Sequence, residues 1–464
     1  MKAFRLGFKS RNFASKGVFV AGSILFLLAA GPALPVCAGE FSVTLKAAED
    51  GALSSSGRYK SARLSAEAAH AAAGASASLL YPRLALEGNL KYAESIPTIA
   101  LPAVLGGPKA LGDNWNYSIG PSAYWTLDGG ILRAGRDAAR KTASARSAEA
   151  ENARRQVLLG ARAAYFGLQL ALEKVYLIGE DLQLSLSQLK DIELGVKAGS
   201  RSRLDGIRSR QEVTARRRDL LRARVELSGT LRDFSFITGL PLPPGKGLPL
   251  DARLAARDYA ANARMLVRAE PYVEILPRFM SATDRAPGKA LPGVTALSDS
   301  AGAYRAAAGG YKAERLPRLT FSARSSIDYP NGSNLYSFLQ NSAGLSLSLP
   351  LFESGRLAER EKESRLNAEA ADAKRDEASG EAGRDFAKAL EEYNALMEEQ
   401  LLNIEAVDDA QEASKLAYEA YKAGGGTWLE VESANLKALQ AKTTAASADA
   451  GMLMKLALLD SLSD

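Results

Sequence analysis

Cysteine and histidine are almost absent from this sequence, which has one of each among 464 residues. A zinc site needs several such ligands, and the one cysteine, Cys37, lies in an N-terminal segment that is interpreted below as a cleaved leader. A zinc site and a Cys/His nucleophile are therefore both excluded in the mature chain. The one histidine, His70, lies in an alanine-rich stretch and is interpreted as a surface or packed residue. The phosphate-binding patterns GxxxxGK(S/T) and GxGxxG are missing too. We therefore expect no catalytic, cofactor-binding or metal-binding residues, and no enzyme.

Long apolar segments are confined to the N-terminus. No run of 18 apolar residues occurs beyond residue 30, so no transmembrane helix is expected after that point. Residues 1–38 have the pattern of a secretory signal peptide, with five basic residues, an apolar segment over 17–30 and a small-residue cleavage site at Val36-Cys37-Ala38. Two alternatives stay open, an uncleaved anchor and lipid attachment at Cys37. The apolar run is shorter than the roughly 20 residues of a spanning helix, and Pro35 and Val36 are poor neighbours for a lipidated cysteine.

The net charge is small once this leader is set aside. Cleavage after Ala38 would remove five positive charges and no negative one, which leaves 54 basic and 53 acidic residues. The sequence pI near 9.1 therefore reflects the leader and gives no reason to expect a nucleic-acid partner. Cleavage would also remove the one cysteine, so the mature chain would hold no disulfide.

One pattern occurs twice, 225 residues apart. It begins with a glycine-bearing turn, continues as a long helical segment and ends with a second glycine-bearing turn. The interval from Asp128 to Asp205 is 77 residues, and so is the interval from Glu353 to Glu430. Self-similarity on this scale indicates a duplicated structural unit, so we predict an internal two-fold repeat.

Two long helices are predicted at 131–196 and 356–421, because neither segment contains proline and both are rich in alanine and charge. Each carries an apolar stripe at steps of three and four residues, which is typical of coiled coils. The stripe residues are Ala161, Tyr165, Leu168, Leu172 and Tyr176 in the first segment and Phe386, Leu390, Tyr393, Met397, Leu401 and Ile404 in the second. At ~1.5 Å per residue each helix is a rod of roughly 100 Å. Such a rod needs a return helix and neighbouring copies to bury its stripe.

Shorter helices and a linker complete the predicted domains. Return helices are expected at 203–237 and 428–460, and further helices at 43–80 and 293–315. The domains are the signal peptide 1–38, a first repeat 39–238, an inter-repeat linker 239–292 and a second repeat 293–464. The linker is rich in proline and glycine over 239–250, and 251–292 is interpreted as irregular or partly helical. The insert 93–114 and its shorter counterpart 329–337 are predicted to be exposed loops.

Four segments alternate apolar and polar residues with period two, which predicts strands with one apolar and one polar face. They are 83–92, 115–125, 318–328 and 339–349. The motif Pro-Arg-Leu stands at the start of the first and third segments, as Pro82-Arg83-Leu84 and Pro317-Arg318-Leu319. The segments are long enough for tilted strands that cross an outer membrane, and the aromatic residues near their ends would form its girdle. Those residues are Tyr92, Trp115, Tyr117 and Trp125.

A soluble antiparallel sheet with one face on a core fits the strands alone equally well. The long proline-free helices favour the membrane interpretation, because rods of this length need neighbouring copies.

The turns that follow the long helices are the sharpest local features. Glycine after each helix suits a left-handed C-terminal cap, and a hydroxyl followed three residues later by a carboxylate has the spacing of a capping box. The residues are Gly199, Ser202 and Asp205 in the first copy and Gly424, Thr427 and Glu430 in the second. Capping alone would explain them. The functional alternative places these tips at one end of the rod, where a ring of copies would present Asp205 and Glu430 around an opening.

The turns from strand to long helix contain Asp128-Gly129-Gly130 and Glu353-Ser354-Gly355. Glycine permits the sharp change of direction and the carboxylate favours the new helix N-terminus, so no chemistry is expected there. Seven arginines between Arg201 and Arg218 are interpreted as partners of acidic residues on neighbouring helices, with an acidic partner at the tip as the alternative. The other helical carboxylates are interpreted as a solvated, ion-paired surface.

This ordered, duplicated set of elements resembles the TolC-like outer membrane efflux protein family. The resemblance spans roughly 41–462. It is carried by the two Pro-Arg-Leu motifs, by Leu127-Asp128-Gly129-Gly130 and Pro350-Leu351-Phe352-Glu353-Ser354-Gly355, and by the turns from Gly199 to Asp205 and from Gly424 to Glu430. The resemblance implies a homotrimer in which each chain gives four strands to a shared 12-stranded barrel, while long α-hairpins form a periplasmic α-barrel.

The resemblance also bears on the tips. Asp205 and Glu430 fall where the family places acidic or gating residues at the entrance. Gly426 stands where members often carry a basic residue, and Ser433 stands where they often carry a second acidic one. These two departures put an inherited hydrogen-bond network at the gate in doubt.

The function expected from the resemblance is that of a passive exit duct of a tripartite efflux pump or type I secretion system. Its partners would be a periplasmic adaptor, an inner-membrane transporter of the RND or ABC type, and outer membrane lipid in a Gram-negative-type bacterium. The alternative is a periplasmic adaptor, a structural linker that docks onto such a duct. An adaptor usually has one hairpin between small β domains, so the two-fold repeat and four amphipathic strands speak against it. The sequence gives no information on the cargo.

Overall fold

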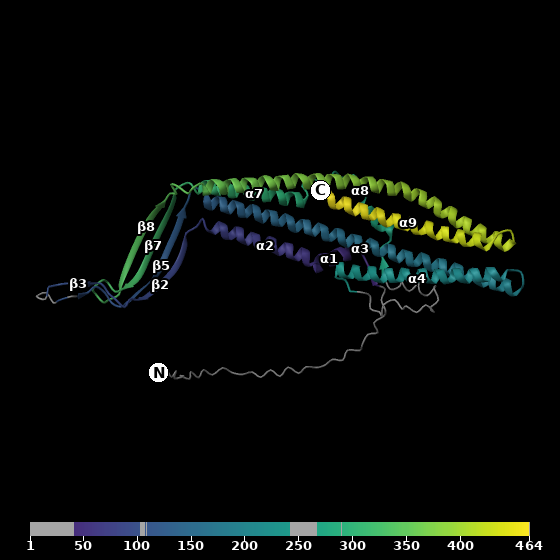
Figure 1. The fold of residues 1–464 in the computed structure, drawn as a ribbon, viewed down its shortest axis with the longest axis horizontal. Helices are drawn as coiled ribbons and strands as arrows, with labels where there is room; N and C mark the ends of the chain where they lie inside the picture. The colour runs from purple at the N-terminus through teal and green to yellow at the C-terminus, as the bar shows by residue number, and fades with distance from the viewer. Residues whose placement is uncertain (1–40, 103–106, 108, 242–266, 289, 464) are drawn as a thin grey trace, which may run out of the picture. The chain divides into compact units, whose positions relative to one another are not determined.

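The computed structural model describes residues 41–102, 107, 109–241, 267–288 and 290–463. The predicted signal peptide with Cys37 and residues 242–266 of the predicted linker lie outside these ranges. The described part is mainly helical, with two very long helices and a four-stranded sheet (Figure 1). Two strands, a long helix and a return helix follow one another twice along the chain. The predicted fold class and its internal repeat are thus confirmed.

Two antiparallel helical hairpins make up most of the described chain. In the first, α3 (Ile131–Lys197) turns into α4 (Arg203–Thr238); in the second, α8 (Arg356–Ala423) turns into α9 (Trp428–Leu462). The 67 residues of α3 and the 68 of α8 give each helix a length of roughly 100 Å. The two hairpins contact each other mainly through α3 and α9.

The halves of the long helices nearer the sheet are covered by two further helices. α2 (Gly57–Ser78) packs on α3, and α7 (Pro292–Ala313) packs on both α3 and α8. His70 of α2 contacts Ser147 at 2.9 Å, and Lys141 donates to Asp299 of α7 at 2.9 Å. These contacts place both helices against the first half of α3.

The apolar stripes determine which faces of the long helices are buried. Ala161, Tyr165 and Leu168 of α3 are fully buried, as the predicted stripe requires. In α8 the stripe is buried at Phe386 but exposed further on, at Met397 (47%), Leu401 (69%) and Ile404 (53%). This stretch of α8 therefore presents an apolar surface on the single chain.

The largest apolar core lies where the N-terminal segment, α3, α4 and the end of α9 meet. Tyr165, Phe166, Phe234 and Phe279 pack ring against ring with centroids 6.2–6.3 Å apart. The buried Tyr165 hydroxyl donates to the Val43 carbonyl at 2.9 Å and accepts the Glu270 N–H at 2.8 Å. Burial raises the pKa of Tyr165 to about 12, so this hydroxyl keeps its proton.

Two short strands in this region were missed by the sequence analysis. β1 (Phe41–Val43) pairs in parallel with β6 (Val267–Ala269), and α6 (Tyr272–Met280) follows β6. The interpretation of 251–292 as irregular or partly helical was therefore incomplete where the structure describes this segment. A strand of three residues is too short to show a period of two.

The predicted helix over 43–80 was wrong in detail. The segment forms the end of β1, then α1 (Leu45–Ser55) and α2, with a break at Ser56. The backbone of Ser56 is extended (φ −65°, ψ 111°), and its hydroxyl accepts the Tyr59 N–H at 3.2 Å. A serine in this role ends one helix and caps the next.

The sheet consists of four antiparallel strands in the order β2–β5–β7–β8. They are β2 (Arg83–Tyr92), β5 (Trp115–Leu127), β7 (Arg318–Tyr329) and β8 (Phe338–Ser348). The strand pairs of the two repeats adjoin through β5 and β7, so β2 and β8 are the edges and pair with no further strand in the described residues. The predicted loop 93–114 contains a short hairpin of β3 (Thr98–Ile99) and β4 (Lys109–Ala110).

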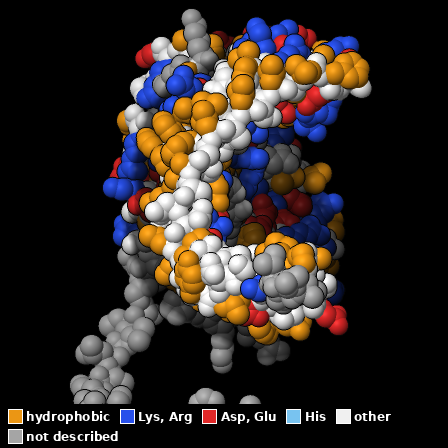
Figure 2. Space-filling model, turned by 90° about the vertical axis from the view of Figure 1, so that its left-hand side faces the viewer, with side chains coloured by type: hydrophobic (Ala, Val, Ile, Leu, Met, Phe, Trp, Pro, Cys, Tyr) orange, Lys and Arg blue, Asp and Glu red, His pale blue; other side chains and the backbone are white. Residues whose placement is uncertain are grey.

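One face of the sheet is mainly apolar along all four strands, with Ser325 opposite Asn341 as its polar pair. The register sets Leu84 opposite Ala123, Trp125 opposite Phe321 and Leu319 opposite Leu347. Figure 2, viewed from the strand end, shows hydrophobic side chains along the left-hand side of the curved band of backbone. Leu84 is 82% exposed and Leu347 is 69% exposed, so this face is uncovered in the single chain.

Among the helices described, none is long and apolar enough to cross a membrane.

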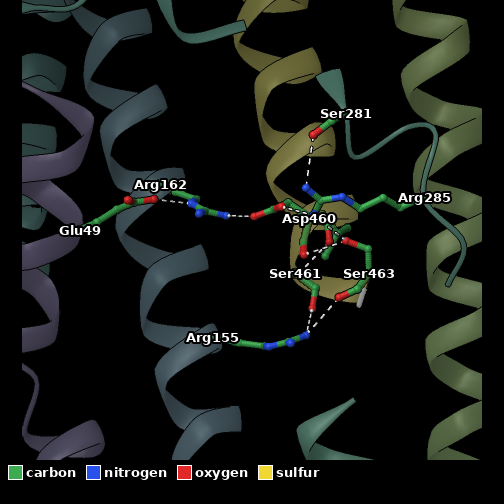
Figure 3. A network of polar contacts seen from close by, with 9 residues as sticks. Glu49, Arg155, Arg162, Ser281, Arg285, Asp460, Ser461 and Ser463 are labelled. Carbon is green, nitrogen blue, oxygen red and sulfur yellow. Dashed lines mark hydrogen bonds and ion pairs between the residues drawn. The ribbon is translucent and has the colours of Figure 1, made fainter. Parts of the chain in front are cut away.

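A polar network fixes the end of α9 against α1 and α3 (Figure 3). Arg162 of α3 lies between two carboxylates, with Nε 2.5 Å from Glu49 Oε1 and Nη1 2.7 Å from Asp460 Oδ2. The other Asp460 oxygen lies 3.0 Å from Arg285, and Arg155 donates to the Ser463 carbonyl at 3.2 Å. The Arg162 side chain is largely buried, so its loss would leave partly buried carboxylates without their partner.

Candidate functional site

The candidate site lies at the tips of the two hairpins, where α3 turns into α4 and α8 turns into α9 (right-hand end of Figure 1). Gly199 and Gly424 have φ of 72° and 85°, the left-handed region that side chains with a β-carbon avoid. The turns close by main-chain bonds, from the Ser200 N–H to Gly195 and from the Gly425 N–H to Ala420, both 2.9 Å. Each long helix therefore ends in a tight glycine-dependent reversal.

The two return helices are capped differently. At α9 the capping box is complete, because the Thr427 hydroxyl accepts the Glu430 N–H (3.4 Å) and the Glu430 carboxylate accepts the Thr427 N–H (2.9 Å). At α4 the Ser202 hydroxyl accepts the Leu204 N–H at 3.1 Å, and Asp205 does not return to Ser202. The predicted capping box was therefore wrong for the first copy. Aspartate is one methylene shorter than glutamate, and the Asp205 carboxylate has a different partner.

That partner belongs to the other hairpin. The Tyr421 hydroxyl at the end of α8 donates to Asp205 Oδ2 at 3.3 Å. The Arg201 guanidinium lies 4.4 Å from the centroid of the Tyr421 ring and donates to the Lys422 carbonyl at 2.7 Å. Burial and the Asp205 carboxylate raise the pKa of Tyr421, so its hydroxyl remains a donor. Side chains of the turn between α3 and α4 thus bind the last turn of α8.

A small apolar core lies directly behind these contacts. Trp428 is 1% exposed and packs with Ile192 and Val431, and its ring meets that of Tyr421 at 5.4 Å. One turn earlier in α8, the Tyr418 hydroxyl donates to Asp191 of α3 at 2.7 Å. Burial and Asp191 hold the pKa of Tyr418 above its ordinary value.

A buried ionic cluster lies further from the tip, between α3 and α4. Glu212 and Arg216 of α4 are 3% and 6% exposed. Arg216 Nε lies 2.6 Å from Asp181 of α3, whereas Arg216 Nη2 lies 4.0 Å from Glu212. Burial raises the pKa of Glu212 to about 7, although the Arg216 charge lowers it. The interpretation of helical carboxylates as a solvated surface was wrong for Glu212 and Asp181.

A hydrogen-bond chain continues this polar interior across the hairpins. Asn435 of α9 is 1% exposed, donates to Gln188 of α3 at 2.9 Å and accepts from Ser414 of α8 at 2.7 Å. In the described part of the chain, no group of three or more His, Cys, Asp or Glu side chains is placed to hold a metal ion. The cluster therefore joins helices by hydrogen bonds and ion pairs.

The strand-to-helix turns are built by local bonds. The Asp128 carboxylate accepts the N–H groups of Gly130 (3.0 Å) and Leu132 (2.7 Å) at the start of α3. Glu353 instead accepts from the Arg356 side chain at 2.8 Å. Gly130 and Gly355 have φ of 121° and 84°, and a β-carbon on Gly129 would lie 2.4 Å from Leu316. These residues have structural partners that account for them.

The four aromatic residues of the predicted girdle lie at both ends of the sheet. At the end remote from the long helices, Tyr92 and Trp115 pack at 5.1 Å, and Tyr117 stacks on Tyr329 at 5.1 Å. At the helix end, the Trp125 indole donates to the Leu80 carbonyl at 3.1 Å. All four predicted residues are between 37% and 57% exposed.

The sequence analysis did not identify Tyr421 and Trp428 as parts of the tip, and it did not identify Glu212 as a buried residue. Trp428 directly follows the capping residue Thr427, and this position could have indicated a small apolar core at the tip. So large an apolar side chain at the start of a helix needs other side chains to cover it. The burial of Glu212 gave no signal, because its neighbours in α4 are charged residues of the kind found on exposed helices.

Comparison with known proteins identifies similar folds. The family model described as outer membrane efflux protein matches residues 50–239 and 296–463. The outer-membrane channel OprN is 20% identical with a TM-score of 0.70, and covers 90% of this chain and 89% of its own. The outer membrane protein VceC from Vibrio cholerae is 18% identical with a TM-score of 0.68, over 90% and 95%.

The MtrE outer membrane channel of Neisseria gonorrhoeae, in its open state, is 20% identical with a TM-score of 0.69. Its alignment covers 90% of this chain and 88% of its own. No curated protein sequence matches the chain.

Proposed function

Because this chain belongs to the outer membrane efflux protein family, we propose that it is the passive exit duct of a tripartite efflux pump or type I secretion system. The observation that carries the proposal is the four-stranded sheet, joined to hairpins of roughly 100 Å. One face of the sheet is apolar and exposed, and its two edges pair with no other strand among the described residues. The chain would conduct solutes from an inner-membrane transporter across the periplasm and the outer membrane. It would catalyse no reaction, and its transporter would supply the energy.

The sheet supports an oligomer. Strand edges with free N–H and C=O groups are not tolerated in a bilayer, so β2 and β8 would pair with β8 and β2 of neighbouring copies. Three copies would close the 12-stranded barrel that the family resemblance implies. The exposed stripe of α8 at Met397, Leu401 and Ile404 would be covered in the same assembly.

The aromatic residues support the orientation of the sheet in the membrane. Tyr92, Trp115 and Tyr117 at one end and Trp125 at the other would mark the two interfaces, where amphipathic rings contact lipid head groups. The helix end of the sheet would face the periplasm, because the long helices begin there and extend away from the sheet.

The tips support a gated entrance. Tyr421 binds Asp205, and Arg201 binds the end of α8, so these contacts hold the two hairpins of one chain together. Gly426 stands where many family members carry a basic residue, and Arg201 of the other turn supplies a guanidinium to the same tip. Docking of a periplasmic adaptor would open the entrance by separating these contacts.

The alternative of a periplasmic adaptor has less support. An adaptor needs one hairpin and no sheet that faces lipid, whereas this chain has two hairpins and an apolar exposed sheet face. Both functions predict long helices in the periplasm, so the second hairpin and the sheet are what separate them.

Membrane fractionation, unheated gel electrophoresis and planar-bilayer conductance test the proposal together. We expect an outer membrane protein that migrates as a trimer and forms ion-conducting channels. A soluble monomer without channel activity would refute it, and an outer membrane monomer without conductance would do so as well.

A further inference from the structure

The repeated Pro-Arg-Leu motif places an arginine at the same point of each repeat. Arg83 is the first residue of β2 and Arg318 is the first residue of β7, so both lie at the helix end of the sheet. The next residues, Leu84 and Leu319, belong to the apolar face. Since successive side chains of a strand point to opposite faces, both arginines stand on the polar face.

All the charged residues of the four strands share this polar face. They are Arg83, Glu87, Lys91, Arg318, Arg324 and Asp328. Basic residues thus outnumber acidic ones by four to two. Figure 2 shows charged side chains in the hollow beside the curved band, opposite its hydrophobic side.

The two acidic residues of this face are already bound within the sheet. Tyr124 donates to Glu87 at 3.0 Å, and Ser118 donates to Asp328 at 2.6 Å. Arg324 donates to the same Ser118 at 2.7 Å, beside Asp328. The charge of Arg324 is therefore offset locally by Asp328.

Arg83 and Arg318 differ from Arg324. Both are exposed, and neither side chain makes a hydrogen bond or ion pair with any residue that the structure describes. A guanidinium keeps its charge at every working pH. The helix end of the polar face therefore carries two uncompensated positive charges per chain.

We propose that Arg83 and Arg318 form a ring of fixed positive charge at the helix end of the strands, which favours the passage of anionic solutes over cationic ones. The inference rests on the proposed function, because the ring closes only when several chains join their sheets around one lumen. A low-dielectric wall strengthens the field of such charges inside a pore. Rings of arginine or lysine select anions and phosphates in other pores by the same physics. The solutes favoured would be small molecules that bear carboxylate or phosphate groups.

The test is the reversal potential of the full-length protein in planar bilayers under a KCl gradient. The variant R83Q/R318Q removes both charges and keeps polar side chains at both positions. We expect its chloride-to-potassium permeability ratio to fall about threefold at ~0.1 M salt, and by less at ~1 M, where the screening length is short. Because the tips are unchanged in this variant, the difference from the wild type isolates the ring.

Two further variants separate charge from structure. R83K/R318K keeps both charges and should keep the wild-type ratio. Lys109 is exposed in the β3–β4 hairpin, outside the four-stranded sheet. Lys109→Gln is therefore a control that removes one charge and should leave the permeability ratio unchanged. Arg83→Gln, which also removes one charge, should lower the ratio.

The outcomes distinguish this inference from the proposed function. A wild-type protein that forms no channel would overturn the proposed function and the ring with it. A conducting R83Q/R318Q channel with the wild-type ratio would overturn the ring alone. If the double variant does not assemble, the single variants Arg83→Gln and Arg318→Gln decide the question, and a ratio unchanged in both overturns the inference.

Discussion

Glu212 should make the stability of this protein depend on pH. It is 3% exposed, and burial raises its pKa to about 7 from the ordinary 4.5. The folded protein therefore binds this proton more tightly than the unfolded chain does. By linkage, the free energy of unfolding falls as the pH rises from about 4.5 to about 7. The difference between the two pKa values corresponds to about 3 kcal/mol.

The variant Glu212→Gln removes this dependence while keeping the size of the side chain. We expect it to raise the free energy of unfolding by up to about 3 kcal/mol near pH 8, where the wild type must bury a carboxylate, and to change it little near pH 4. Arg216 keeps Asp181 as its partner at 2.6 Å, so the substitution leaves no unpaired cation. Urea unfolding of the purified protein in detergent, across this pH range, measures both values.

A matched control is Glu405→Gln, the same change at an exposed position of α8, which should leave the pH profile as it is. Asp449 is half-buried, and desolvation raises its pKa to about 6. Its carboxyl should leave a weaker pH slope of the same sign in the Glu212→Gln variant. If Glu212→Gln loses stability near pH 8, then Arg216 holds Glu212 in its charged form and the reasoning is refuted.

Three further variants test the tips. Tyr421→Phe removes the hydroxyl that binds Asp205 and should cost about 1 kcal/mol per chain, so channels of this variant should open more often in bilayer recordings. The control is Tyr176→Phe, because the Tyr176 hydroxyl binds Glu180 within α3. Channels of the control variant should open no more often than those of the wild type. Thr427→Ala breaks the capping box and should cost about 1 kcal/mol, which faster hydrogen exchange in the first turn of α9 would report. Asp205→Ala together with Glu430→Ala should alter conductance or cation preference, and unchanged values would reduce both residues to structural roles.

The long elements were predictable because their patterns repeat many times. A helix of 67 residues shows its stripe over many turns, and a strand of ten or more residues shows its alternation several times. Because the unit is duplicated, each pattern occurs a second time in the sequence and supports the same prediction. Turn glycines such as Gly199 and Gly424 were predictable for a different reason, because their left-handed backbone excludes almost every other residue.

The missed features depend on partners that lie far away in the sequence. β1 and β6 are separated by more than 220 residues and form a pair of only three residues each, so neither carries a local signal. Asp205 has the spacing of a capping residue, but its partner Tyr421 is 216 residues away. Glu212 sits among arginines in α4, and only the packing of α3 against α4 decides that it is buried.

The duplicated turns have therefore diverged in what they bind. The second turn satisfies its own backbone, since Thr427 and Glu430 cap α9 reciprocally. In the turn between α3 and α4, Asp205 does not cap the helix backbone. The Asp205 carboxylate and the Arg201 side chain instead bind the last turn of α8. Separation of the two hairpins would break these side-chain contacts and the bond from Tyr418 to Asp191, but it would leave both caps and both glycine reversals intact. The proposed entrance would open by movement of the hairpins as whole units, because the bonds between the hairpins are distinct from the bonds that fold each one.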